Sequence, residues 1–443
     1  MRIAIVGGGI SGLATAFFVR RQAPSTELTL FEAAPRLGGT MRTEEVGGFL
    51  FETGSNGFLT NKPDTLDLVH DSGADPLLLP SSDAARIRYI YSDRLHRLPE
   101  SPGAFLGSGL LSPFGKLRVA AEVLIPPRRD QGEESLQSFG YRRVGREFTD
   151  CFLDAMSAGI YAATPASLSV NAAFPAVVRL EQDYGGLFRG MIRKRKREAG
   201  PGGILMSFSG GVSRFIDHLG ALLGDAVHIG CAVTGIEPDG DGYRLNVGDS
   251  SQVFDQVVLA TPSYTAAELL DGIDKPLAAR LREIGYSPVS VVGLGYHDLD
   301  HPLNGFGLLT TTAAALPILG VLWDSSIFPD RAPPGAKSLR VMIGGQRNPE
   351  LALREEAELI EIARDGVGTT MGVTATPEVG FVQRWERGIP NYTVGHLGRV
   401  GAIYDRLAAY PGLHLNSNAY RGIGLNDCVA NARSCAEQVL KQG

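Results

Sequence analysis

The hydrophobic and polar positions of the first 34 residues change period twice. RIAIV (residues 2–6) is a short β-branched run, and such a run predicts a fully buried parallel strand. Three glycines follow, and residues 10–22 then carry apolar side chains at helical spacing with arginines near the end. ELTLFEAA (residues 27–34) predicts a second strand. The order of strand, glycine turn, helix and strand predicts a βαβ unit.

Similar patterns return far along the chain. Residues 223–247 predict two strands joined by a hairpin turn, and residues 254–262 predict another buried strand. Near the end, residues 413–415 predict a strand that is followed by a glycine-containing loop. A helix then follows the capping residues Asn426 and Asp427.

The stretches between these patterns divide the chain into units. Residues 98–202 are mostly helical in pattern, and residues 263–409 alternate strands with helices. We therefore predict an α/β protein with a discontinuous Rossmann-like domain and two insertions, one α+β and one helical. The predicted bounds are 1–72, 203–262 and 410–443 for the Rossmann-like domain, 73–97 and 263–409 for the α+β domain, and 98–202 for the helical domain.

Composition fits a folded chain and narrows its partners. Hydrophobic residues make up 44% and charged residues 20% of the 443 positions, and the formal net charge is -6. A negative balance argues against a nucleic-acid partner. The four cysteines have neither metal-ligand nor disulfide-framework spacing, and no secretory signal begins the sequence, so we expect a cytoplasmic protein without a metal site.

Two segments leave a peripheral membrane contact open. RKRKRE (residues 193–198) is either a solvated face or a site for anionic lipid head groups. Residues 103–127 are apolar but broken by Gly, Pro, Lys and Arg, so they pack in the fold or lie on a membrane. The inner face of the cell membrane would then be the location. The sequence also leaves a homodimer open.

The glycine turn predicts a dinucleotide site. Glycines there allow a tight turn, close approach to a pyrophosphate and close helix packing, and the helix amino terminus points N–H groups at the phosphates. Glu32 ends the second strand, where a carboxylate accepts ribose hydroxyls and disfavours a 2'-phosphate, which leaves NAD or FAD. The predicted contacts are Gly7, Gly9, Ile10, Ser11, Gly12 and Glu32.

A second glycine pair favours the longer dinucleotide. Gly38 and Gly39, flanked by Arg36 and Arg42, offer a backbone nest and counter-charges that a simple NAD enzyme does not need. This E-x3-R-x-GG-x2-R pattern resembles the flavoenzyme superfamily of amine oxidases, phytoene desaturases and protoporphyrinogen oxidases. The resemblance implies FAD as the cofactor.

Further cofactor contacts follow from the resemblance. Residues 52–56 would approach the flavin ring, and the strand at Val233 would meet the adenine, although core packing explains Val233 equally well. The last helix would stabilise the negative charge of reduced flavin, with plain capping as the alternative. The implied contacts are Gly54, Ser55, Asn56, Val233, Asn418, Gly424, Leu425 and Asn426.

Longer strings point to one family. AGIYAATPASLSVNAAFP (residues 158–175), GFGLL (305–309), SSIFPDRAP (325–333), GIPNYTVGH (388–396) and SNAYRGIGLNDC (417–428) look like the oxygen-dependent protoporphyrinogen/coproporphyrinogen oxidases of haem biosynthesis. The resemblance implies six-electron oxidation of a porphyrinogen to the porphyrin, with O2 reduced to H2O2. Three positions depart from the family pattern: Ser417 replaces a glycine, GSNGF replaces G-P-x-S-F, and Ala163-Thr164 replaces a Gly-Asp or similar pair.

The resemblance also implies a substrate site. Arg88 matches an arginine that pairs with a propionate, and Leu308, Leu319 and Phe328 match positions that enclose the pyrroles. The backbone carbonyl near Gly159 matches a proposed proton acceptor. Without the resemblance, Arg88 would be read as a surface residue and the apolar residues as core.

Two rival functions stay open at this point. A flavin amine oxidase shares the cofactor and fold, but its usual lysine is absent from residues 285–307. A non-enzymatic, lipid-binding relative such as a GDP-dissociation inhibitor shares the architecture without flavin.

Overall fold

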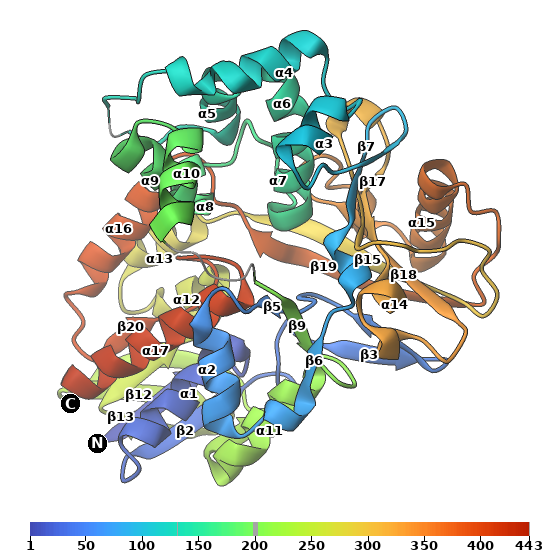
Figure 1. Ribbon diagram of the computed structural model, residues 1–443. Helices are drawn as coiled ribbons and strands as arrows, with labels where there is room; N and C mark the ends of the chain where they lie inside the picture. Colours follow the sequence, from blue (N-terminus) through green and yellow to red (C-terminus); the bar gives the residue numbers. More distant parts are fainter. Residues whose placement is uncertain (131, 198–202, 443) are drawn as a thin grey trace.

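The computed structural model describes residues 1–130, 132–197 and 203–442 (Figure 1). Three units are visible in it. A five-stranded sheet with its helices carries both chain ends, a seven-stranded sheet lies beside it, and a helical unit lies above both. The predicted α/β fold with a discontinuous Rossmann-like domain and two inserted units is confirmed.

The five-stranded sheet is parallel throughout, in the order β10-β2-β1-β14-β20. Its strands are β1 (Arg2–Val6), β2 (Glu27–Glu32), β10 (Val227–Ile229), β14 (Gln256–Leu259) and β20 (Leu413–Leu415). Ile3 and Ile5 point to one face and Ala4 and Val6 to the other, so both faces are buried, as the β-branched run predicts.

Helices and a small sheet cover these two faces. One face carries α1 (Ile10–Gln22), α2 (Pro63–Ser72), α11 (Ser213–Leu223) and α17 (Leu425–Gln442). The other carries the sheet of β11 (Val233–Asp239), β12 (Gly242–Val247) and β13 (Ser250–Phe254), with helices α12 (Ser263–Leu270), α13 (Lys275–Arg282) and α16 (His396–Leu407). The prediction placed these last three helices in the α+β domain, within residues 263–409. In the structure they share the core of the five-stranded sheet.

The seven-stranded sheet has the order β19-β15-β18-β17-β16-β7-β8. Its strands are β7 (Arg88–Tyr91), β8 (Leu95–Arg97), β15 (Tyr286–Tyr296), β16 (Gly307–Thr310), β17 (Ile318–Leu322), β18 (Lys337–Gly344) and β19 (Val379–Pro390). Helix α15 (Glu356–Met371) packs on one face, where it buries Leu308, Val321 and Val341. The opposite face turns toward the helical unit and the five-stranded unit (Figure 1).

Short strands connect the two larger sheets. The hairpin β3 (Thr43–Val46) and β4 (Phe49–Glu52) packs on β15, where a Cβ at Gly293 would lie 2.4 Å from the ring of Phe51. A small sheet has the order β5-β9-β6, with β5 (Phe58–Leu59), β6 (Leu78–Pro80) and β9 (Leu205–Phe208). The short helix α14 (Asp324–Ile327) follows β17.

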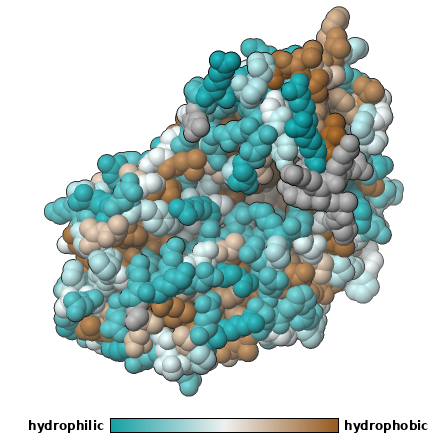
Figure 2. All heavy atoms as spheres, turned by 60° about the vertical axis from the view of Figure 1, so that its left-hand side comes forward, coloured by the Kyte–Doolittle hydropathy of each residue, from teal (hydrophilic) through white to brown (hydrophobic). Residues whose placement is uncertain are grey.

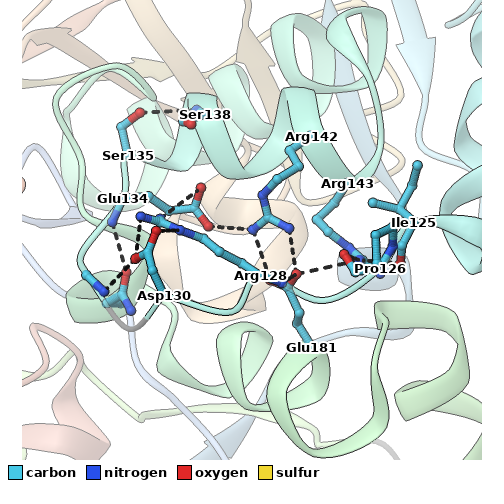
Figure 3. Close-up of polar contacts among 12 residues, drawn as sticks. Ile125, Pro126, Arg128, Asp130, Glu134, Ser135, Ser138, Arg142, Arg143 and Glu181 are labelled. Atoms are coloured by element: carbon cyan, nitrogen blue, oxygen red, sulfur yellow. Dashed lines mark hydrogen bonds and ion pairs between the residues drawn. The ribbon is translucent and has the colours of Figure 1, made fainter.

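The helical unit lies within the predicted insertion 98–202 and contains a buried charge cluster (Figure 3). Its helices are α3 (Pro102–Gly107), α4 (Pro113–Ala120), α5 (Leu136–Arg143), α6 (Arg146–Phe148), α7 (Asp154–Tyr161), α8 (Val170–Ala173), α9 (Pro175–Tyr184) and α10 (Leu187–Arg197). Arg143 is fully buried and pairs with Glu122, while Arg142 donates to Glu181 at 2.5 Å. The Glu122 carboxylate accepts the N–H of Leu187 at 2.8 Å, so it also stabilises the start of α10.

Candidate active site between the two sheets

The amino terminus of α1 forms an open backbone cradle. A Cβ at Gly12 would lie 1.9 Å from the carbonyl oxygen of Gly7, so only glycine allows this approach of helix to turn. A Cβ at Gly9 would meet nothing within 4 Å, which shows open space in front of the helix. Among the described residues no side chain caps α1, and its first turn holds no acid. The free N–H groups therefore suit an anion such as a pyrophosphate.

Glu32 stands at the edge of this cradle. One of its carboxylate oxygens accepts the N–H of Gly8 at 2.7 Å, and the other accepts the N–H of Ala34 at 2.8 Å. Its carbonyl oxygen accepts the N–H of Cys231 at 2.9 Å, which brings the half-buried Val233 close to the same edge. Each carboxylate oxygen retains acceptor capacity for a ribose hydroxyl.

The second glycine pair lies directly against the first. The N–H of Gly38 donates to the carbonyl of Gly8 at 2.9 Å, and Arg36 donates to the carbonyl of Gly39 at 3.2 Å. Burial, and next the nearby charge of Arg42, lower the pKa of Arg36. Two guanidinium groups at a backbone nest would be stabilised by a bound diphosphate.

The carboxyl-terminal loop completes this side of the site. Helices α1 and α17 follow the parallel strands β1 and β20, so both begin at the carboxyl edge of the sheet, where ligands of such sheets bind. The side chain of Asn416 donates to the hydroxyl of Thr15 at 2.9 Å, which joins the loop to α1. Asn426 donates to the carbonyl of Leu59 at 2.9 Å, and its buried Oδ1 has no hydrogen-bond partner among the described residues.

The predicted contacts in this loop differ in exposure. Gly424 is exposed, Asn418 is half-buried, and Leu425 is buried at the start of α17. The carbonyl of Asn418 accepts the hydroxyl of Tyr392 at 2.7 Å.

The loop that follows β4 joins the cradle to the seven-stranded sheet. Arg340 of β18 is buried and donates to the carbonyl of Glu52 at 2.6 Å and to Oδ1 of Asn56 at 2.8 Å. It also pairs with Asp324 at 3.0 Å, and burial raises the pKa of that carboxyl. Sequence reasoning singled out Asn56 but missed Arg340, because nothing in the local pattern of β18 marks its distant partners.

Gly54 and Ser55 lie in the same loop. Gly54 is exposed, and the hydroxyl of Ser55 donates to the carbonyl of Gly57 at 3.2 Å. The indole N–H of Trp385, another residue that sequence reasoning missed, holds the carbonyl of Thr53 at 2.8 Å.

Strand register defines the face of the seven-stranded sheet that is turned toward the cradle. Residues paired across neighbouring strands share a face. One row contains Arg88, Gly307, Leu322 and Arg340, and a second row contains Leu309, Gly320 and Met342. Arg88 is exposed, and its guanidinium lies 5.4 Å from the ring centre of Phe306. Leu309, Leu322 and Met342 are half-buried, as expected for side chains that line a site.

The predicted substrate residues do not all lie on this face. Leu319 is buried against Ala158 of α7 and against Ala162, the residue that follows this helix, on the same side as Leu309. Leu308 points to the opposite face, into the core beneath α15. Phe328 is fully buried behind Leu322. Side chains alternate between the two faces of a strand, so Leu308 and Leu309 must point to opposite faces. The sequence does not show which of these faces is buried, so it could not tell which leucine lines the site.

The last turn of α7 lies over the row of Leu309. A Cβ at Gly159 would be 2.6 Å from the Leu309 side chain, so the helix backbone itself touches the sheet there. Gly159 and Ile160 are exposed. At the end of the helix the N–H of Ala163 donates to the carbonyl of Ser157 at 3.3 Å, and the N–H of Ala162 donates to the carbonyl of Ala158 at 3.0 Å.

Comparison with known proteins shows which families and structures the chain resembles. Residues 10–440 match the model of the flavin containing amine oxidoreductases. The coproporphyrinogen III oxidase of Bacillus subtilis is 28% identical, with 99% of this chain and 97% of that protein covered. The chloroplastic protoporphyrinogen oxidase of Oryza sativa is 32% identical, with 98% and 87% covered. A crystal structure of a protein from Exiguobacterium superposes with a TM-score of 0.87 at 27% identity and covers 100% of this chain and 99% of that one.

Proposed function

The chain belongs to the flavin containing amine oxidoreductase family, and from that premise we propose that it oxidises a porphyrinogen to the corresponding porphyrin, with FAD as its cofactor and O2 as the final acceptor. Protoporphyrinogen IX and coproporphyrinogen III are the two candidate substrates. The names of the curated relatives support this choice over an amine substrate, and the flavin family supports it over a flavin-free lipid carrier.

The hydrogen-bond donors and acceptors of the cradle match the groups of FAD. The N–H groups at the start of α1 and the nest at Gly38 and Gly39 would hold the diphosphate, and Glu32 would accept the ribose hydroxyls. The start of α17 would stabilise negative charge on the far end of the cofactor. Bound FAD would supply a two-electron acceptor for hydride from a methylene bridge of the substrate.

The opposite wall fits a large apolar macrocycle with acidic tails. Leu309, Leu322 and Met342 offer an apolar surface that excludes water. Arg88 would pair with a propionate at the rim. The carbonyl oxygen of Gly159 would accept a hydrogen bond from a pyrrole N–H and so orient the ring nitrogen that loses its proton to water.

One observation carries this proposal. The cradle, which backbone N–H groups, glycines, Glu32 and Arg36 form, adjoins a sheet face that carries the half-buried apolar residues Leu309, Leu322 and Met342 and has Arg88 at its rim. A tetrapyrrole would set its apolar ring on these residues and a propionate against Arg88, whereas a cationic amine offers no acidic group for Arg88 to pair with.

The test uses the purified full chain. We expect a yellow protein whose absorbance near 450 nm is bleached by dithionite, and we expect porphyrin fluorescence to rise when either porphyrinogen is added in air. Competition between the two porphyrinogens identifies the preferred one. Peroxide from polyamines alone, without porphyrin formation, would overturn the proposal in favour of an amine oxidase.

We further propose that the helical unit docks on an anionic membrane surface. Figure 2 shows hydrophobic side chains gathered at the top of the molecule, over this unit. Phe114 is 83% exposed and Leu124 is 78% exposed, and Leu106, Leu117 and Ile192 of the same unit are also exposed. The last five residues of α10 are all basic in sequence, which complements anionic head groups. Of the stretch RKRKRE, the side chains after Arg193 lie outside the described residues.

No helix among the described residues is both long and apolar enough to cross a membrane. Co-sedimentation with phosphatidylglycerol vesicles tests the proposed surface contact, with phosphatidylcholine vesicles for comparison. We expect binding to the anionic vesicles that the double variant Phe114→Asp/Leu117→Asp weakens at least tenfold. The variant Leu353→Asp, exposed on another unit, serves as the control. A wild-type protein that stays in the supernatant contradicts the proposal, and a doubled mass in light scattering that the double variant abolishes would assign the surface to a second copy of the chain.

A further inference from the structure

A buried ion pair holds the start of α7 on the seven-stranded sheet. Asp154 and Arg347 pair at 2.9 Å, and both side chains are 8% exposed. Asp154 also accepts the backbone N–H of Thr312 at 2.6 Å and its hydroxyl at 2.9 Å. Arg347 donates in addition to the carbonyl of Thr310 at 2.8 Å. The pair therefore joins α7 to the ends of β16 and β18.

A π-helical turn aims Asp154 at these partners. Residues Thr149–Leu153 form this turn between α6 and α7, so the helix continues but its register shifts immediately before Asp154. Such turns insert an extra residue into a helix and are often found at functional sites. Without the extra residue, Asp154 would point about 100° away around the helix.

The other end of α7 is held by the same sheet turn. Ala162 ends the helix at φ 48°, and its carbonyl accepts the N–H of Gln346 at 2.8 Å. A Cβ at Gly345 would lie 2.6 Å from this oxygen, so the two segments are in close contact. Adjacent residues 346 and 347 thus fix both ends of a helix of eight residues.

These two anchors set the position of Gly159. The helix backbone at Gly159 touches Leu309, the residue whose row forms the apolar wall. A release of Asp154 from Arg347 would free the start of α7 while the Gln346 contact still holds its end. The helix could then tilt, and the space above Leu309 would change in width.

We propose that Asp154 and Arg347 are positioning residues that set the width of the substrate pocket, and this inference rests on the proposed function. The side-chain hydrogen bonds of both residues go to Thr310, Thr312 and the Asp154–Arg347 pair itself, and none goes to the described residues of the predicted cofactor cradle. Loss of the pair should therefore weaken binding of the porphyrinogen and leave FAD in place.

The experiment compares Arg347→Met, Asp154→Asn, the double variant and Arg347→Lys. The control is Arg354→Met, which removes an exposed ion pair with Glu358 a short distance along the same segment. For each protein we measure kcat and KM with the preferred porphyrinogen, the flavin spectrum and the FAD dissociation constant.

We expect each single variant to raise KM at least tenfold, to lower kcat as well because the Gly159 carbonyl moves with α7, and to bind FAD like the wild type. A looser pocket loses binding energy that the ground state and the transition state share, which appears in KM. The double variant should be no worse than the poorer single variant, because both changes break one interaction. The KM of Arg347→Lys should lie between those of the wild type and Arg347→Met, since lysine cannot bridge Asp154 and Thr310 as a guanidinium does.

Three results would overturn the inference: a KM equal to that of the control variant, additive losses in the double variant, or loss of FAD together with substrate. If Arg347→Met does not fold, Arg347→Lys and Asp154→Asn decide the matter. A wild-type protein that oxidises no porphyrinogen fails the proposed function instead, and that outcome is separate because it appears before any variant is made.

Discussion

At the scale of single residues, neighbours of the same type have opposite roles. Leu308 and Leu309 are adjacent and chemically identical, but the pleat of β16 sends Leu308 into the core beneath α15 and Leu309 toward Gly159. The resemblance to known sequences supplies no such distinction, because either leucine satisfies the string GFGLL. Only the register with β17 and β7 separates them.

Leucine-to-alanine substitutions at these two positions should separate stability from substrate binding. Leu308→Ala leaves a cavity in a fully packed core, so we expect it to lower the free energy of unfolding by about 2–5 kcal/mol with KM nearly unchanged. Leu309→Ala removes half-buried surface that the substrate would cover, so we expect a higher KM and a smaller loss of stability. Denaturant unfolding and steady-state kinetics on both proteins check the pair. The reverse assignment of effects would place the substrate on the α15 side of the sheet.

Buried arginines show what local sequence patterns do not reveal. Arg340 and Arg331 are buried and pair with Asp324 and Glu52, whose carboxyl pKa values burial raises. Asp324 lies on α14, and Glu52 lies on β4, far from both arginines in the sequence. From sequence alone, a single arginine within an apolar segment indicates a surface position or the end of a strand. The buried ion pairs that connect the two units could therefore not be predicted.

At the scale of elements, the predictions that succeeded were local. The βαβ unit of β1, α1 and β2 follows from three neighbouring patterns whose chemistry requires no distant partner. The strand β20 and the helix α17 were found for the same reason. Predictions failed where packing between distant segments decides which unit a helix joins. Helices α12, α13 and α16 pack in the core of the five-stranded unit, and their own sequence patterns do not specify this contact. The π-helical turn before α7 has no local signature either.

The helical unit should respond to acid through Glu181. Burial alone would raise the pKa of this carboxyl, but hydrogen bonds from Arg142 and from the Arg128 N–H, together with the charge of Arg142, outweigh it, so the pKa lies below its ordinary value. A lowered carboxyl pKa contributes stability that is complete above about pH 4.3, the ordinary value for glutamate, and is lost as the pH falls through the folded value. We therefore expect α9 and α10 to lose protection below about pH 4.

Hydrogen exchange of peptides from α9 and α10 between pH 6 and 3.5 measures this effect. Glu181→Gln breaks the buried pair, so we expect about 3 kcal/mol less stability of the unit at neutral pH and a flatter response to acid. Glu361→Gln changes an exposed carboxylate on α15 and should leave both unaltered. If the Glu181→Gln variant responds to acid as the wild type does, the charge cluster is not the cause of the acid response.

At the scale of the whole molecule, the candidate cofactor site is assembled from distant parts of the chain. Strand β1 pairs with β14, and β14 pairs with β20, so residues 3, 256 and 413 lie in neighbouring strands. Asn416 then joins the carboxyl-terminal loop to Thr15 of α1. Each insertion leaves the five-stranded unit and returns to it, and both inserted units adjoin that unit (Figure 1). A ligand held by both chain ends should therefore stabilise the whole fold.

Removal and return of FAD should shift the melting temperature accordingly. Free FAD at 100 times its dissociation constant stabilises the folded state by about 2.7 kcal/mol, which for a chain of this length corresponds to about 3 °C if it unfolds in one transition. Gly12→Ala places a Cβ against the Gly7 carbonyl and so should abolish the shift. Arg88→Met changes only the opposite wall and should retain it. Differential scanning fluorimetry of the three apoproteins across an FAD series measures this. Because FAD would bind at the meeting point of both chain ends, a wild-type melting temperature independent of FAD would contradict the cradle itself, whatever the substrate proves to be.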